Sequence, residues 1–130
     1  MLTAAKTPAN DVCLLDNQLL KTLNELSDDP SESMVKELAD LFFETTPPLL
    51  AQLASAVRDK QFDVALRLAH RLKGSAANIG ALQFSAFCAE LEQKIKLTPE
   101  QMCRATLDEI NSSFCETQKE ITNWLSLYNK

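Results

Sequence analysis

Residues 69–80 read AHRLKGSAANIG, and this stretch decides how the rest of the chain is interpreted. It contains the only histidine of the protein, His70, and both of its glycines, Gly74 and Gly80. A helical bundle can be built without any of these three residues. Their gathering within eleven positions therefore needs an explanation beyond packing.

The apolar residues around this stretch recur at helical spacing and predict a helix over residues 61–79. At about 100° per residue, one face of this helix collects the core residues Phe62, Ala65, Ala69, Leu72, Ala76 and Ile79. His70 lies roughly 130° from the centre of that face by the same arithmetic. We expect His70 on an exposed side of the helix, with Lys73, Gly74 and Ala77 close to its direction.

Capping signals and apolar periodicity predict four more helices around this one. Their expected bounds are about 16–26, 29–59, 82–96 and 98–128. Asp16, Asp29 and Thr98 are the expected N-caps, and Pro30 and Pro99 follow at the first helical position, where proline is tolerated. Three of these four helices, all but the one over residues 82–96, therefore have a start signal in the sequence.

Two adjacent prolines, Pro47 and Pro48, interrupt the apolar stripe of the second helix. They lack the amides that would bond to the carbonyls of Phe43 and Glu44, so the helix must kink or restart there. Thr46 could serve as the N-cap of a restarted helix. The stripe stays in register across the break, so both halves are expected to line the same core.

The last helix carries a seam with alternating spacings of four and three residues. The seam residues are Cys103, Leu107, Ile110, Phe114, Thr117, Ile121, Trp124 and Tyr128. Such a seam suits either a coiled-coil dimer or one long helix that closes a bundle, and we favour the bundle and a monomer. The expected fold is all-α: an antiparallel four-helix bundle over residues 15–130 with a short additional N-terminal helix, preceded by a flexible arm, residues 1–14.

Composition narrows the class of protein. The chain has 130 residues, enough for one domain with a real core, and its net charge of −5 and lack of a basic stripe argue against a nucleic-acid surface. The cysteines at positions 13, 88, 103 and 115 show no metal-ligand spacing, so we expect no metal and no cofactor. Residues 1–15 form neither a signal peptide nor a membrane span, which favours the cytoplasm.

An exposed, lone imidazole limits the chemistry that the site can perform. A single histidine binds metals weakly. General acid–base catalysis would need partner residues such as Ser, Cys or Asp arranged around the histidine, and the sequence shows no such arrangement. Nucleophilic phosphotransfer needs one free imidazole nitrogen, with the other nitrogen held as N–H. Glu92 on the following helix is the candidate acceptor for that N–H. Lys73 could stabilise phosphoryl oxygens, and Gly74 could leave room for them.

The stretch and its surroundings resemble histidine-containing phosphotransfer (HPt) domains. The resemblance rests on Ala69-His70-x-Leu72-Lys73-Gly74-Ser75-Ala76, then Ile79-Gly80, then Cys88-x-x-Leu91-Glu92, and on the proline-interrupted helix before the motif. It covers about residues 31–127. It implies that His70 is phosphorylated on Nε2, with Lys73 and Gly74 beside it and Glu92 bonded to Nδ1.

The resemblance also implies a function. Members of the family accept a phosphoryl group from an aspartyl phosphate on a response-regulator receiver domain and pass it to another receiver. The chain lacks a Gly-rich phosphate loop or a kinase motif, so we expect a phosphocarrier, not an enzyme that binds ATP. The expected partners are receiver domains and a hybrid sensor histidine kinase, and we expect a free-standing carrier. The alternative is a non-catalytic helical adaptor that docks on response regulators or sensor kinases.

Overall fold

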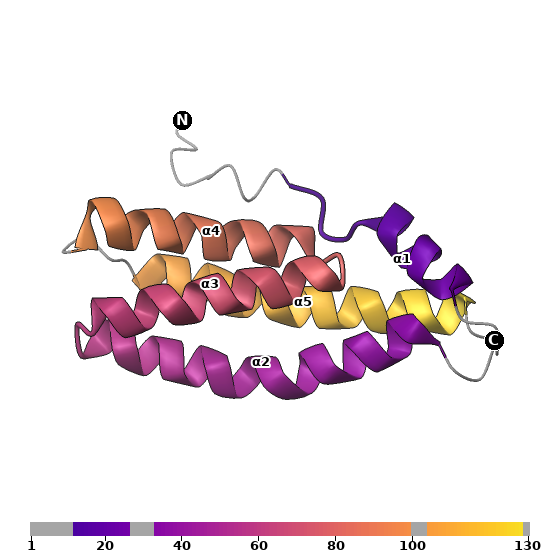
Figure 1. Ribbon diagram of the computed structural model, residues 1–130, viewed down its shortest axis with the longest axis horizontal. Helices are drawn as coiled ribbons and strands as arrows, with labels where there is room; N and C mark the ends of the chain where they lie inside the picture. The colour runs from indigo at the N-terminus through magenta and orange to yellow at the C-terminus, as the bar shows by residue number, and fades with distance from the viewer. Residues whose placement is uncertain (1–11, 27–32, 100–103, 129–130) are drawn as a thin grey trace.

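A computed structural model describes residues 12–26, 33–99 and 104–128 of the chain, and all of its regular elements are helices (Figure 1). The five helices are α1 (Asn17–Glu25), α2 (Met34–Arg58), α3 (Phe62–Asn78), α4 (Leu82–Leu97) and α5 (Arg104–Tyr128). The predicted all-α class is confirmed. In the part of the chain that is described, no helix is both long and apolar enough to cross a membrane.

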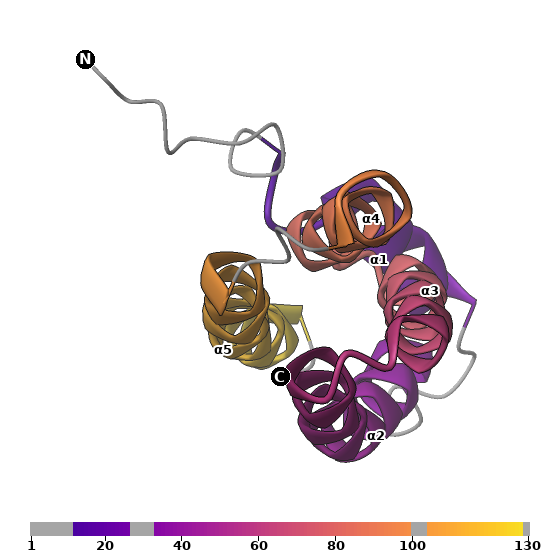
Figure 2. The same ribbon diagram turned by 90° about the vertical axis from the view of Figure 1, so that its left-hand side faces the viewer.

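The four longer helices form an antiparallel bundle. Viewed end-on, α2, α3, α4 and α5 surround a common centre in chain order, and α5 lies next to both α4 and α2 (Figure 2). The short helix α1 packs on α2 at one end of this bundle (Figure 1). The predicted four-helix bundle with a short leading helix is therefore confirmed.

Three phenylalanines join the helices in the core. Phe42 of α2, Phe84 of α4 and Phe114 of α5 are all buried. Their ring centroids lie 5.7 Å apart for Phe42 and Phe84, 5.5 Å for Phe42 and Phe114, and 5.9 Å for Phe84 and Phe114. Tilted or edge-to-face aromatic contacts of this length add to the stabilisation that burial provides. The aromatic cluster therefore fixes α5 against α2 and α4.

The start of α1 is attached to the turn between α3 and α4. The predicted N-cap Asp16 accepts a hydrogen bond from the backbone N–H of Leu19 through Oδ1 at 3.0 Å. The backbone N–H of Asp16 donates to the carbonyl of Gly80 at 2.8 Å, and Gly80 has a positive φ of 73°. The carbonyl of Leu14 accepts from Gln83 N–H at 3.5 Å. The end of the predicted arm thus contacts α4, while residues 1–11 lie outside the described residues.

The start of α2 differs from the prediction. The helix begins at Met34, and Ser33 is its N-cap, with Oγ accepting from the N–H of Lys36 at 3.2 Å. The expected cap Asp29 and its neighbour Pro30 lie outside the described residues. Ser33 has extended dihedral angles, so the helix cannot run continuously from Pro30 through it. The N-cap of the described helix is thus Ser33, four residues after the expected one.

The double proline bends α2 without ending it. The helix runs unbroken from Met34 to Arg58, and the ribbon is bowed near its middle (Figure 1). The suggested restart at Thr46 is wrong, because Thr46 is a buried residue inside the helix. Burial of Phe42 before the prolines and of Leu49 after them holds both halves against the same core. Packing therefore outweighs the loss of two backbone hydrogen bonds.

The seam of α5 faces the core as its spacing predicts. Ile110, Phe114, Thr117, Ile121 and Trp124 are buried, and Leu107 is half-buried. Cys103 and the side chain of Tyr128, at the two ends of the seam, lie outside what the structure describes. Thr98, the expected N-cap of this helix, is the C-cap of α4, and residues 100–103, which precede the described start of α5 at Arg104, lie outside the described residues. The seam thus closes the bundle of its own chain.

Candidate functional site

The rotation of α3 places His70 on the surface. Ala69 and Leu72, its neighbours in the sequence, are completely buried and fix the core side of the helix. The side chain of His70 is 71% exposed. The wheel prediction for the position of His70 is therefore confirmed. An imidazole in this position can be approached by a group as large as another protein.

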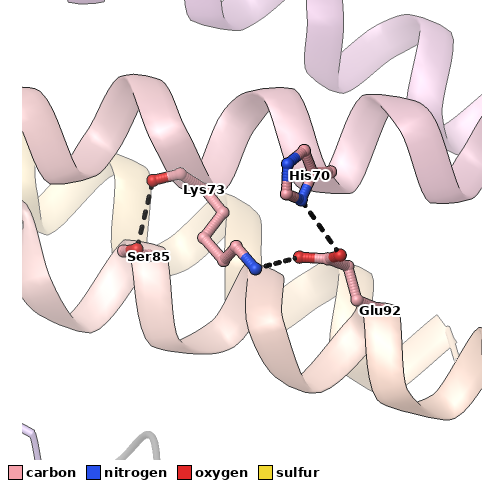
Figure 3. A network of polar contacts seen from close by, with 4 residues as sticks. All are labelled: His70, Lys73, Ser85 and Glu92. Carbon is pink, nitrogen blue, oxygen red and sulfur yellow. Dashed lines mark hydrogen bonds and ion pairs between the residues drawn. The ribbon is translucent and has the colours of Figure 1, made fainter.

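Glu92 brings a carboxylate from α4 to the inner edge of the imidazole (Figure 3). Its Oε2 lies 3.3 Å from Nδ1 of His70, and only 8% of its side chain is exposed. A carboxylate can only accept, so a hydrogen bond here requires the hydrogen to be on Nδ1. A neutral ring in that tautomer has its lone pair on Nε2. The predicted contact between Glu92 and His70 is present.

Lys73 lies one turn after His70 and contacts the same carboxylate. Its Nζ is 2.7 Å from Oε1 of Glu92, and its side chain is 35% exposed (Figure 3). The carbonyl of Lys73 accepts a hydrogen bond from Oγ of Ser85 at 3.1 Å, which joins the backbone of α3 to α4. One buried carboxylate thus holds a cation on one oxygen and an imidazole on the other.

The ionisation of Glu92 reflects these contacts. Burial alone would raise the pKa of the Glu92 carboxyl, but the Lys73 ammonium and, second, His70 lower it. The net effect is a pKa below the ordinary value of 4.5, so the carboxyl is charged at neutral pH. One turn away, burial and then the Glu92 carboxylate raise the pKa of the Cys88 thiol to about 12, against an opposing effect of Lys73. Cys88 is therefore a neutral, buried neighbour of the site.

Gly74 leaves an open space beside this group. It is exposed, and a Cβ added to it would meet no heavy atom within 4 Å. Glycine in a helix interior costs about 1 kcal/mol relative to alanine. No contact within the described chain requires that cost, because an alanine side chain would fit. The space is thus available to a molecule that approaches His70.

The structure brings together all four residues that the sequence singled out. His70, Lys73 and Gly74 lie within about one turn of α3, and Glu92 reaches them from α4. The ion pair between Lys73 and Glu92 and the hydrogen bond from Ser85 were not predicted from the sequence. The opposite charges of Lys73 and Glu92 were a signal for the ion pair. The sequence held no comparable signal for the hydroxyl of Ser85.

A family of known proteins matches this chain over most of its length. The model of the Hpt domain family matches residues 37–125, a range that includes most of α2 and the whole of α3 and α4. The chain therefore belongs to the Hpt domain family.

Individual relatives agree with this membership. Histidine-containing phosphotransfer protein 4 of Arabidopsis thaliana is 26% identical over 113 residues, which are 85% of this chain and 87% of the relative. Pseudo histidine-containing phosphotransfer protein 2 of Oryza sativa subsp. japonica is 29% identical over 116 residues, which are 87% of this chain and 76% of the relative. The chain is similar to both over most of its length.

Solved structures show the same fold. Histidine-containing phosphotransfer protein B of Pseudomonas aeruginosa aligns with a TM-score of 0.75 at 23% identity, over 91% of this chain and 99% of that structure. A histidine-containing phosphotransfer protein from maize aligns with a TM-score of 0.74 at 26% identity, over 88% of this chain and 84% of that structure. The bundle is therefore the fold of known phosphotransfer proteins.

Proposed function

We propose that this protein carries phosphoryl groups in a two-component phosphorelay and that His70 is the residue that becomes phosphorylated. Membership of the Hpt domain family supports the phosphotransfer role. One observation carries the assignment of the residue: the only histidine of the chain is 71% exposed, and its inner nitrogen lies against a buried carboxylate. No second histidine competes for the role.

The transfer step uses the lone pair of Nε2. Glu92 favours the tautomer with hydrogen on Nδ1, and the neutral ring in that tautomer has its lone pair on Nε2. Nε2 attacks the phosphorus of an aspartyl phosphate, an N–P bond forms, and the bond from phosphorus to the aspartate oxygen breaks. The aspartate leaves as a carboxylate with the bonding electrons. The reverse reaction on a second receiver returns the phosphoryl group to an aspartate.

Lys73 and Gly74 assist this step from the same side of α3. The ammonium of Lys73, one turn from His70, supplies positive charge for the phosphoryl oxygens, whose charge must be stabilised during transfer. The open space at Gly74 admits the phosphoryl group and the backbone of the partner. The mechanism requires no nucleotide, and we assign the protein no autokinase activity and no cofactor.

The partners follow from this chemistry. The donors and acceptors are response-regulator receiver domains, one of them attached to a hybrid sensor histidine kinase, and the carrier acts as a monomer. Any Mg²⁺ that the transfer needs belongs to the acidic pocket of the receiver. We place the protein in the cytoplasm, where such receivers act.

Labelling by a phosphorylated receiver tests this function. The wild-type protein is expected to gain a phosphate that is labile in acid and stable in base, as a phosphoramidate is. His70→Gln keeps a polar side chain of similar size but has no nucleophilic nitrogen, so labelling should be lost. Equal labelling of the wild type and His70→Gln would refute the assignment of His70.

A second candidate function is a helical adaptor that binds receivers or kinases without carrying phosphate. Its support is the similarity to a rice relative whose name calls it a pseudo phosphotransfer protein. The adaptor hypothesis predicts that His70→Ala leaves signalling in the cell unchanged. The carrier hypothesis predicts that the same substitution abolishes signalling while the variant still binds the receiver.

A further inference from the structure

The Glu92 carboxylate is shared between two side chains of α3, and the sharing is unequal. Lys73 Nζ lies 2.7 Å from one carboxylate oxygen, whereas His70 Nδ1 lies 3.3 Å from the other. Since 92% of the Glu92 side chain is shielded from solvent, as its 8% exposure shows, its charge requires a nearby cation. In this arrangement, Lys73 supplies that cation and His70 needs no charge.

No other described element offers Glu92 a cation. The charged groups that act on its ionisation are Lys73 and His70, and none of the described residues of α1, α2 or α5 joins them. Cys88 of α4 faces the same region as a neutral thiol. Arg67 and Arg71 flank His70 on α3 but are exposed, where water and salt screen their charge.

We propose that Lys73 and His70 take turns as the cation that neutralises Glu92. Lys73 occupies the carboxylate before transfer and thereby keeps the imidazole uncharged and nucleophilic, and the phosphorylated ring replaces Lys73 afterwards. This inference rests on the proposed phosphorylation of His70. It gives Lys73 a positioning role, exerted through Glu92, in addition to its role beside the phosphoryl group.

The charges balance through the transfer step. When the lone pair of Nε2 forms the N–P bond, Nδ1 keeps its proton, so the ring gains a positive charge. The transferred phosphoryl group carries the negative charges, and the receiver aspartate leaves with the electrons of the broken P–O bond. The cationic ring then neutralises Glu92 through Nδ1–H, and the Lys73 ammonium is free to bond the phosphoryl oxygens. The buried carboxylate has one cation at each stage.

An NMR titration of the unphosphorylated protein tests the exchange. The ring signals of His70 are unambiguous because the chain has no other histidine. Lys73→Met removes the ammonium and keeps the apolar stem, so His70 should protonate to supply the missing cation. We expect the midpoint of the imidazole titration to rise by about one pH unit, because a buried opposite charge favours the charged ring. Lys73→Gln should give the same rise.

Arg71→Met is the matched control, since it removes a neighbouring cation that is exposed to solvent. Its midpoint should stay within about 0.3 pH unit of the wild type. The double variant Lys73→Met/Glu92→Gln should titrate like Glu92→Gln alone, because the shift passes through the carboxylate. Circular dichroism checks that every variant keeps the helical fold.

Two results would overturn the exchange. One is a midpoint in Lys73→Met equal to that in Arg71→Met, and the other is a raised midpoint that persists in the double variant. No phosphoryl donor is present in the titration, so its result does not depend on labelling. Failure to label His70 would instead refute the proposed function and leave the titration unchanged.

Discussion

At the scale of single residues, the site places an exposed side chain and a buried one within a few ångströms of each other. His70 is open to solvent, but the group that orients it, Glu92, is almost completely buried. The low dielectric around the buried Glu92 carboxylate strengthens its contacts with Lys73 and His70. The exposed imidazole of His70 remains accessible from the solvent. A buried carboxylate behind an exposed nucleophile thus combines a fixed orientation with free approach by a partner.

Gly74 should respond differently to a small and to a large substitution. Gly74→Ala is expected to raise the free energy of unfolding by about 0.5–1 kcal/mol, because the added methyl group meets no atom and the helix is favoured. Gly74→Leu should keep the fold and slow phosphoryl acceptance at least about tenfold by blocking the partner, a barrier increase of about 1.4 kcal/mol. Urea unfolding and transfer kinetics measure the two effects.

Asn123→Leu provides the control, since Asn123 is exposed on α5, on another part of the bundle. It adds a similar apolar surface and should leave the transfer rate unchanged. If Gly74→Leu transferred as fast as Asn123→Leu, the space at Gly74 would have no role in the approach of the partner.

The sequence predicts which of these residues share a side, but not how their side chains pair. Helical period alone places His70 away from the buried Ala69 and Leu72, with Lys73 one turn after it. The choice of Lys73 between Glu92 and solvent depends on several side-chain torsions and on the tilt of α4 against α3. Neither quantity can be read from residue spacing, so the ion pair was found only in the structure.

At the scale of elements, helix boundaries depend on which of several local signals wins. Asp16 caps α1 as predicted, because its Oδ1 reaches the N–H of Leu19. At α2, Ser33 is the cap, and Thr46 lies in the helix interior although prolines follow it. Burial of apolar residues on both sides of the prolines decides this outcome. A local capping rule contains no information about such tertiary contacts.

The backbone conformation of Gly80, in the turn between α3 and α4, predicts how its substitution changes stability. Gly80 has φ of 73°, and an added Cβ would lie 3.2 Å from Cβ of Asp16. Gly80→Ala is therefore expected to lower the free energy of unfolding by about 1–2 kcal/mol, opposite in sign to Gly74→Ala. Urea denaturation of both variants checks the pair. A Gly80→Ala protein as stable as the wild type would show that the turn relaxes without cost.

At the scale of the whole molecule, one carboxylate links the site to stability. Glu92 has a lower pKa in the folded chain than its ordinary 4.5, so the charged form stabilises the fold. This contribution is full above pH 4.5 and is lost as the pH falls through the lower folded value. The carrier should therefore become less stable on acidification, partly through its own functional site.

Glu92→Gln separates this contribution from the rest of the bundle. At neutral pH the variant should be less stable than the wild type by about 1 kcal/mol, because Lys73 is partly exposed and its ion pair is partly screened. The difference should shrink as the pH falls below the folded pKa of Glu92, where the wild-type carboxyl is also uncharged. Urea unfolding at neutral and acidic pH measures it. A difference that does not vary with pH would contradict the predicted linkage.

In the proposed function, Nε2 of His70 accepts the phosphoryl group while Glu92 accepts a hydrogen bond from Nδ1. It is tested most directly by ³¹P and ¹⁵N NMR of the protein after phosphorylation by a receiver. The single histidine makes the assignment unambiguous. We predict one phosphoryl group, bonded to Nε2 of His70, with Nδ1 still protonated. A phosphoryl group on Nδ1, or on any residue other than His70, would contradict this account.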